Sequence, residues 1–221
     1  MAPDAASRPA APTWTLVVPV KLLAQAKSRL TSLDPLLRSR LALAMAADTI
    51  AAATAATTVG TAVVVTDDPD VADLAAALGA VALPDSPAAG LNEALAHGAA
   101  YSGRHWPDRG RAGLAGDLPA VRPAELDAAL AAAWPLGAAF VPDADGTGTT
   151  LYAAAPGHEF RPSFGPGSRA AHLATGAVEL STVPGTALTG LRRDVDTLDD
   201  LHRAAAIGLG PQTAALLPAV P

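Results

Sequence analysis

The chain has 221 residues, of which 50% are hydrophobic, only 4% are aromatic and 55 are alanine. This length suits one α/β domain with a sizeable core, or two very small domains. The absence of cysteine excludes disulfides, thiolate metal sites, iron–sulfur clusters and a cysteine nucleophile. The net charge of −6 argues against nucleic-acid binding, because it leaves no excess of cations to cover phosphates. No apolar stretch reaches the length of a membrane span and no signal peptide is recognisable, so we expect a cytoplasmic protein without membrane contact.

Apolar, β-branched runs alternate with alanine-rich stretches along most of the chain. The runs predict strands at residues 14–20, 61–66, 80–83, 111–115, 138–141 and 150–155. Helices are predicted at residues 35–57, 69–78, 91–101, 123–133, 168–175 and 198–207. Residues 1–12 and 211–221 are rich in proline and alanine and are expected to be loose tails of a domain at 13–210.

This alternation of strands and helices predicts a single-domain α/β fold with a mostly parallel, doubly wound sheet. In such sheets ligands bind beyond the carboxyl ends of the strands. Functional residues are therefore expected in the loops that follow Val20, Thr66, Ala115 and Val141.

The loop after the first strand carries the only two lysines of the chain, Lys21 and Lys27, together with Arg29. Lysine is a compact point charge that suits phosphate binding, so three cations at this edge of the sheet indicate a polyphosphate clamp. The alternative is a solvated basic loop. The chain lacks both G-x-x-x-x-G-K-[ST] and G-x-G-x-x-G, which removes the main support for a P-loop or a dinucleotide site.

Acidic residues stand at two further positions where a metal could bind. Asp117, preceded by Gly116, directly follows a predicted strand, where its carboxylate could hold Mg²⁺ on a nucleotide phosphate. Asp194 and Asp196, if extended, point to one face and could share that cation. The alternative is a capping role, with Asp196 or Thr197 at the start of the last predicted helix. One acid can bind metal while its neighbour caps the helix, so both interpretations stay open.

Two glycine-rich turns that also carry hydroxyl side chains lie at residues 142–150 and 164–169. The second turn leads into a predicted helix, and backbone N–H groups at a helix start can bind an anion. Two tight turns without a ligand are the alternative.

The five histidines show no i, i+4 pair and no HExxH motif. We expect them to be surface or capping residues: His97, His105, His158, His172 and His202. No G-x-S-x-G motif is present, so a serine hydrolase is not expected.

Seven short motifs occur in order between residues 14 and 210: P-V-K-x-L-x-x-A-K-S-R-L at 19–30, V-V-V-T-D-D at 63–68, A-G-L-N-E-A-L at 89–95, G-D-L-P at 116–119, P-D-A-D-G-T-G-T-T at 142–150, F-G-P-G-S at 164–168 and D-V-D-T at 194–197. Together they resemble the phosphoenolpyruvate / 2-phospho-L-lactate guanylyltransferases of coenzyme F(420) biosynthesis, for which the names CofC and FbiD are used. The resemblance implies the Rossmann-type fold of the MobA-like and sugar-nucleotide transferases. The lysine loop replaces the glycine-rich first loop of that wider group, as it does in the guanylyltransferases. Leu198 stands where relatives often have proline, which should affect helix entry more than chemistry.

The resemblance also implies roles for individual residues, each at a position that matches a motif. The GTP site would comprise Pro19, Lys21, Lys27, Arg29, Thr66, Gly90, Asn92 and Gly116. Mg²⁺ would be held by Asp117 and Asp196, with Asp194 as a further neighbour. The three-carbon acid would bind at Thr150, Gly165 and Ser168. Lys21, Lys27, Arg29 and Asp117 would then be the catalytic residues.

The implied reaction is attack by an oxygen of the acceptor's phosphate on the α-phosphorus of GTP, with pyrophosphate leaving. The nucleophile is already an anion, so the site needs charge compensation and alignment rather than a general base. The expected acceptor is phosphoenolpyruvate or 2-phospho-L-lactate, and the composition, typical of high-GC actinobacteria, favours phosphoenolpyruvate. The unstable product is expected to pass to the next enzyme of the pathway.

Two other functions stay open from the residues alone. A MobA-like or sugar-phosphate nucleotidyltransferase with another acceptor would use the same cations and carboxylates. A silent nucleotide-binding module that regulates a partner would bind GTP without releasing pyrophosphate. The choice between GTP and ATP also stays open, because the base is read by loop backbone that the sequence does not place.

Overall fold

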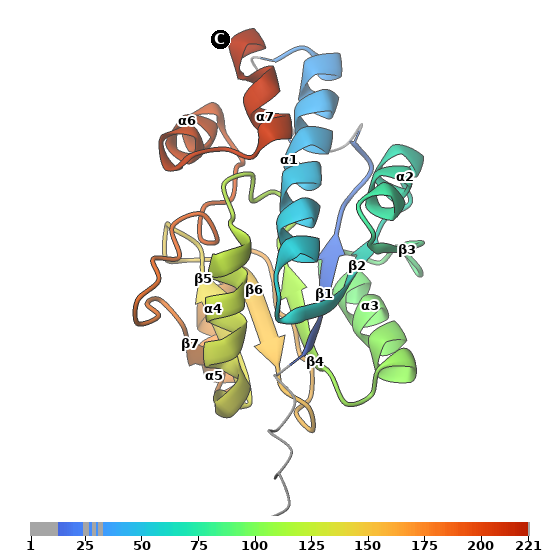
Figure 1. Ribbon diagram of the computed structural model, residues 1–221, viewed down its shortest axis with the longest axis vertical. Helices are drawn as coiled ribbons and strands as arrows, with labels where there is room; N and C mark the ends of the chain where they lie inside the picture. The colour runs from blue at the N-terminus through green and yellow to red at the C-terminus, as the bar shows by residue number, and fades with distance from the viewer. Residues whose placement is uncertain (1–12, 24–26, 28–29, 31–32, 221) are drawn as a thin grey trace, which may run out of the picture.

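Seven strands form one twisted sheet within residues 13–23, 27, 30 and 33–220, the part of the chain that the computed structural model describes (Figure 1). The strands are β1 (Trp14–Pro19), β2 (Val59–Val65), β3 (Val81–Leu83), β4 (Gly110–Leu114), β5 (Ala138–Pro142), β6 (Thr149–Ala154) and β7 (Val178–Glu179). Their order across the sheet is β3-β2-β1-β4-β6-β5-β7. Only β6 runs against its neighbours, pairing antiparallel with both β4 and β5. The mostly parallel sheet predicted from the sequence is therefore confirmed, with one strand reversed.

Helices cover both faces of the sheet and its upper end in Figure 1. They are α1 (Pro35–Ala55), α2 (Pro69–Ala77), α3 (Leu91–His105), α4 (Pro123–Ala133), α5 (Ser168–Ala174), α6 (Leu198–Ile207) and α7 (Pro211–Leu216). Short 3₁₀ turns follow α4 at Trp134–Leu136 and α7 at Leu217–Ala219. None of the described helices is long and apolar enough to cross a lipid bilayer.

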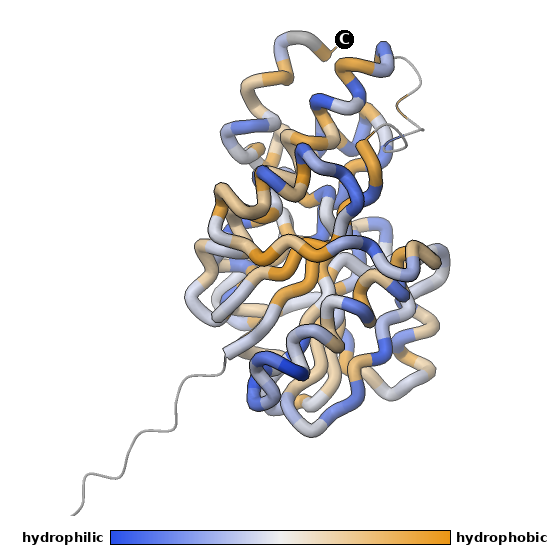
Figure 2. The backbone as a smooth tube through the Cα atoms, turned by 90° about the vertical axis from the view of Figure 1, so that its right-hand side faces the viewer, coloured by the Kyte–Doolittle hydropathy of each residue, from blue (hydrophilic) through white to orange (hydrophobic). Residues whose placement is uncertain are grey.

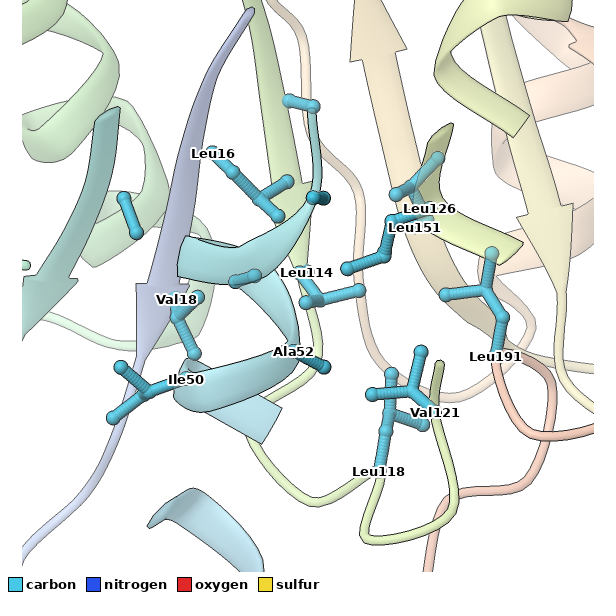
Figure 3. Packing of buried hydrophobic residues seen from close by; sticks show 14 of the residues in the cluster. Leu16, Val18, Ile50, Ala52, Leu114, Leu118, Val121, Leu126, Leu151 and Leu191 are labelled. Carbon is cyan, nitrogen blue, oxygen red and sulfur yellow. The ribbon is translucent and has the colours of Figure 1, made fainter. Parts of the chain in front are cut away.

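Alternate residues of each strand enter different layers of the core, because successive side chains of a strand point to opposite faces. Leu16 and Val18 of β1 pack with α1, α2 and α4, whereas Val17 between them packs with α3. Figure 3 shows the first of these layers, in which Ile50 of α1 lies against β1. Apolar residues accordingly gather in the central strands, as the tube in Figure 2 shows.

The predicted helix starts are built as the sequence indicates. Asp34 accepts hydrogen bonds from the N–H groups of Leu36 and Leu37, and proline occupies the first position of α1. The start of α6 is a capping box, in which Thr197 and Asp200 bond to each other's backbone N–H. The prediction that Thr197 caps this helix is confirmed, and Asp196 is left for another role.

The prediction of a loose tail at 211–221 is wrong for most of its length. Residues 211–216 form α7, which lies beside α1 in Figure 1. The buried carboxylate of Asp48, on α1, accepts hydrogen bonds from the N–H groups of Gln212 and Thr213. Helix α7 thus takes its cap from a residue 164 positions away, which local sequence does not reveal. The other expected tail, residues 1–12, lies outside the described part of the chain.

Candidate active site

Asp117 stands three residues beyond the carboxyl end of β4, in a turn that is packed against β1. Gly116 makes this possible, because a Cβ at that position would lie 2.9 Å from the carbonyl oxygen of Pro19. The turn is fixed from the other side by α1, where the hydroxyl of Thr49 accepts the N–H of Leu118 at 3.0 Å. The close approach brings Asp117 to the loop after β1, as the predicted site requires.

The segment 194–196 reaches the same place from the other end of the chain. The N–H of Val195 donates to the carbonyl oxygen of Asp117 at 3.2 Å, and the Val195 side chain is fully buried. Residues on either side of a buried, extended residue point away from the core. Asp194 and Asp196 are therefore held beside Asp117 by one backbone hydrogen bond and one apolar anchor.

Lys27 lies between two of these carboxylates. Its ammonium donates to Asp117 and, at 3.3 Å, to Asp196. The lysine side chain is only 9% exposed, against 27% for Asp117 and 46% for Asp196. Burial alone would favour the neutral amine, but the two carboxylates outweigh it and hold the pKa of Lys27 above its ordinary value. The ammonium is therefore charged throughout the physiological pH range.

Asp194 is the most perturbed carboxyl group of the site. Burial raises its pKa to about 7, with further contributions from the negative charges of Asp117, Asp143 and Asp196. The four carboxyl groups at this edge of the sheet repel one another when ionised, and this repulsion favours the binding of cations beside them.

Two adjoining cavities open at this edge, and they share Pro19, Val20, Lys21 and Leu91. The first, of about 430 Å³, contains the group formed by Lys27, Asp117 and Asp196. The second, of about 240 Å³, lies towards β2 and β3 and is lined by Asp67, Asp85 and Gly90 among others. A separate cavity of about 540 Å³ beside residues 181–193 has two arginines but no such lysine–carboxylate group. We therefore place the candidate active site in the first two cavities.

The residues predicted to bind GTP are divided between these cavities and other roles. Pro19, Lys21, Lys27, Gly90 and Gly116 all line one cavity or both. The hydroxyl of Thr66 instead accepts the N–H of Asp68, and Asn92 bonds the backbone of Phe164 through both amide atoms. Arg29 lies outside the described residues.

The residues predicted to bind the acceptor lie in three neighbouring segments. Thr150 lies in β6, where its hydroxyl faces the carbonyl of Val141 at 3.5 Å. Gly165 has φ of +125°, a conformation that suits only glycine. Ser168 begins α5, and its hydroxyl is buried and has no hydrogen-bond partner among the described residues. The acceptor role of these three residues stays a prediction.

The predicted Mg²⁺ site also stays a prediction. In the described ranges, no group of three or more His, Asp or Glu side chains is arranged to hold a metal ion. Asp117 and Asp196 nevertheless fit a hard cation, because carboxylate oxygens are its preferred ligands and a positive group already lies between them.

The five histidines were expected to be surface or capping residues, and for His172 this expectation is wrong. His172 is fully buried, and its ring lies among Phe140, Tyr152 and Phe164. Burial lowers its pKa to about 4, so the ring is neutral at physiological pH. Its position in the alanine-rich segment after the F-G-P-G-S turn gave no sign of this, because its partners are distant in sequence.

The sheet order and the helices on both faces define an α/β fold that this chain shares with solved nucleotide-diphospho-sugar and nucleotidyl transferases. A protein from Desulfovibrio desulfuricans G20 assigned as a nucleotide-diphospho-sugar transferase has the same fold, with a TM-score of 0.71 over 93% of this chain and 94% of that one, at 15% identity. A nucleotidyl transferase from Methanothermobacter is also similar in fold, with a TM-score of 0.54 over 94% of this chain and 99% of that one, at 17% identity.

Sequence comparison is more specific than fold. A family model described as "Guanylyl transferase CofC like" matches residues 14–181. A phosphoenolpyruvate guanylyltransferase of Thermomonospora curvata is 54% identical over 95% of this chain and 90% of its own. One of Streptomyces scabiei is 56% identical over 91% of this chain and 94% of its own. This chain belongs to the CofC-like guanylyl transferase family, which confirms the resemblance drawn from the seven motifs.

Proposed function

We propose that this protein transfers GMP from GTP to phosphoenolpyruvate and releases pyrophosphate, in the biosynthesis of coenzyme F(420). The observation that carries the proposal is the charged ammonium of Lys27 between Asp117 and Asp196, in the cavity beyond the carboxyl ends of β1 and β4. The identity to phosphoenolpyruvate guanylyltransferases over nearly the whole chain supports the choice of substrates.

The chemistry requires two anions to meet, and the site is built for that. A phosphate oxygen of the acceptor attacks the α-phosphorus of GTP, the bond from that phosphorus to the bridging oxygen breaks, and pyrophosphate leaves with the electron pair. Lys21 and Lys27 place positive charge in the cavity where the triphosphate would lie. Fixed cations stabilise the charge that builds up in the transition state without reorganising at the moment of reaction.

The second cavity offers acceptor groups that suit guanine. One carboxylate oxygen of Asp85 is buried and has no hydrogen-bond partner among the described residues. Guanine presents two N–H donors on one edge, whereas adenine presents a donor and an acceptor there. A carboxylate facing the base therefore favours GTP over ATP.

Mg²⁺ fits the first cavity, where Asp117 and Asp196 would hold it and it would neutralise phosphate charge. Lys27 would then turn from the carboxylates towards the triphosphate, which its long side chain permits. The product, in which a phosphoanhydride bond links GMP to phosphoenolpyruvate, would pass to the next enzyme of the pathway.

Pyrophosphate release tests the proposal directly. The purified protein is assayed with GTP or ATP against phosphoenolpyruvate, 2-phospho-L-lactate and 3-phosphoglycerate, with and without Mg²⁺. We expect turnover only with Mg²⁺ and GTP, and most with phosphoenolpyruvate. GTP binding without pyrophosphate release from any acceptor would instead support a regulatory module.

A further inference from the structure

His172, on α5, contacts three other segments at the predicted acceptor side of the sheet: β5, β6 and the loop at residues 163–164. Its imidazole is stacked on Tyr152 of β6, with ring centroids 4.7 Å apart and planes 15° from parallel. Phe140 of β5 and Phe164 lie 5.3 and 5.9 Å away. The ring itself is fully buried. A polar ring in such a place is costly unless both of its nitrogens are hydrogen-bonded.

Both nitrogens have partners, and the partners fix the tautomer. The backbone N–H of Ser163 donates to Nε2 at 2.9 Å. A backbone N–H can only donate, so Nε2 carries no hydrogen in the neutral ring and Nδ1 does. Nδ1 then donates to the hydroxyl of Thr149, which lies 3.0 Å away.

The hydrogen-bond partners of His172, and its own helix, belong to the segments that contain the three residues predicted to bind the acceptor. Thr149 directly precedes Thr150 in β6. Ser163 lies two residues before Gly165, and Ser168 lies one helical turn before the histidine in α5. One neutral imidazole thus connects all three segments.

A second side chain holds the same loop from the nucleotide side. Asn92, in the first turn of α3, donates to the carbonyl of Phe164 at 3.0 Å and accepts its N–H at 2.7 Å. Two consecutive N–H groups of the loop, at 163 and 164, are therefore bound by side chains from different helices. Phe164 itself lines the cavity that contains Lys27 and Asp117.

We propose that His172 is a positioning residue for the acceptor: its unprotonated Nε2 holds Ser163, and its protonated Nδ1 holds Thr149 of β6. Together these bonds keep Ser163 and the F-G-P-G-S turn that follows it against β6, in the geometry that binds the phosphorylated acid. This inference rests on the proposed function for its kinetic test. Its structural content, the ordering of residues 163–168 by His172, is tested independently of activity.

Three substitutions of His172 separate its contacts. His172→Phe keeps an aromatic ring but removes both hydrogen bonds. His172→Gln can keep an acceptor near the position of Nε2, and His172→Asn can keep a donor near Nδ1. Thr149→Val removes the hydroxyl group that bonds Nδ1 and leaves the histidine itself unchanged. His202→Gln, at an exposed site on α6, is the matched control.

Two measurements are made on the full-length variants. Steady-state kinetics gives KM for phosphoenolpyruvate and for GTP separately, and hydrogen–deuterium exchange follows the backbone of residues 159–168. We expect His172→Phe to raise the KM for phosphoenolpyruvate roughly tenfold or more, with the KM for GTP changed less than about twofold. Exchange in 159–168 should accelerate. His172→Gln should recover more of the lost affinity than His172→Asn, and Thr149→Val should show a smaller rise.

The proposal is overturned if a folded His172→Phe protein keeps the wild-type KM for phosphoenolpyruvate, or if both KM values rise together. Unchanged exchange at 159–168 would overturn it as well. Should the Phe variant fail to fold, Thr149→Val and His172→Gln give the same decision, because equal effects on both substrates mean a merely structural role. If the wild type itself releases no pyrophosphate, the proposed function fails, and the exchange experiment still decides whether His172 orders the loop.

Discussion

Acidification should weaken the protein through His172, and the effect can be isolated by one substitution. The pKa of His172 is lowered by burial to about 4, against 6.5 in an unfolded chain. Between pH 6.5 and 4, His172 is therefore mostly protonated in the unfolded state and mostly neutral in the folded state. The stability that the neutral ring contributes is complete above pH 6.5 and is lost as the pH falls towards 4.

The size of the loss follows from these two pKa values. Between pH 7.5 and 5.5 the free energy of unfolding should fall by about 1.3 kcal/mol through this residue, and by pH 4.5 by about 2.5 kcal/mol. With a urea m-value of about 2 kcal/mol per molar, the second figure moves the unfolding midpoint by about 1 M. Tyr152, stacked on the ring, does not titrate in this range, because burial raises its pKa above the ordinary value of 10.

The assay compares urea unfolding of the wild type and His172→Gln at pH 7.5, 6.5, 5.5 and 4.5. Other groups titrate in both proteins, including Asp194, whose raised pKa acts in the opposite direction. Subtracting the two curves leaves the contribution of His172. The variant should be less stable at pH 7.5, and the gap should close as the pH falls. A gap that stays constant from pH 7.5 to 4.5 would refute the reasoning, since it would mean that His172 titrates alike in both states.

Four further predictions concern the site and the fold. Lys27→Met should raise the KM for GTP about 10- to 100-fold while the KM for the acceptor changes little, because a charge-assisted contact contributes about 1.5–3 kcal/mol. Steady-state kinetics with one substrate varied at a time measures the two KM values separately. Asp117→Asn and Asp196→Asn should each lower pyrophosphate release roughly a thousandfold with the circular dichroism spectrum unchanged, and near-wild-type turnover at saturating Mg²⁺ would remove that residue from the metal site. Asp85→Asn should reduce the preference for GTP over ATP about tenfold or more, measured as the ratio of the two kcat/KM values. Asp48→Ala should lower the free energy of unfolding by about 2 kcal/mol, because two N–H groups at the start of α7 lose their acceptor; an unchanged urea midpoint would mean that this cap is not needed.

Most of the fold could be predicted because its signals are local. Proline at the first position of a helix and an acid before it mark the starts of α1 and α2, and α4 and α6 have the predicted bounds. Apolar runs that alternate with helical stretches along a chain indicate buried strands of a sheet that is covered by helices on both faces. The two misses depend on distant partners instead. Two-residue β7 exists because it pairs with β5, and α7 exists because Asp48 caps it from another helix.

The candidate site divides in the same way. The meeting of Lys27 and Asp117 could be predicted, because the neighbouring strands β1 and β4 bring their carboxyl ends together. Asp196 is instead predicted from the D-V-D-T motif, and the structure places it beside them through a segment distant in sequence. Asn92 shows the limit. The family resemblance predicts that it lines the nucleotide site, which stays a prediction, and the structure adds that both atoms of its amide group bond the backbone of Phe164. A sequence motif predicts that a residue belongs to a site, and only the three-dimensional structure shows which groups its side chain bonds.

The two halves of the candidate site differ in charge: the lysine–carboxylate group is ionised, whereas the side chains that hold the loop at residues 163–168 are neutral. The reacting anions need cations, so Lys27 keeps its charge with the help of two carboxylates. The loop that is predicted to bind the acceptor would instead be held firmly without an added charge that competes for either substrate. Neutral side chains meet that need, Asn92 on one side and His172 on the other, because each accepts a hydrogen bond from a backbone N–H and brings no net charge. Replacing either by a charged residue would both break the clamp and disturb the balance of charge in the cavity, which is why the inner partners of a site for two anions are expected to be uncharged.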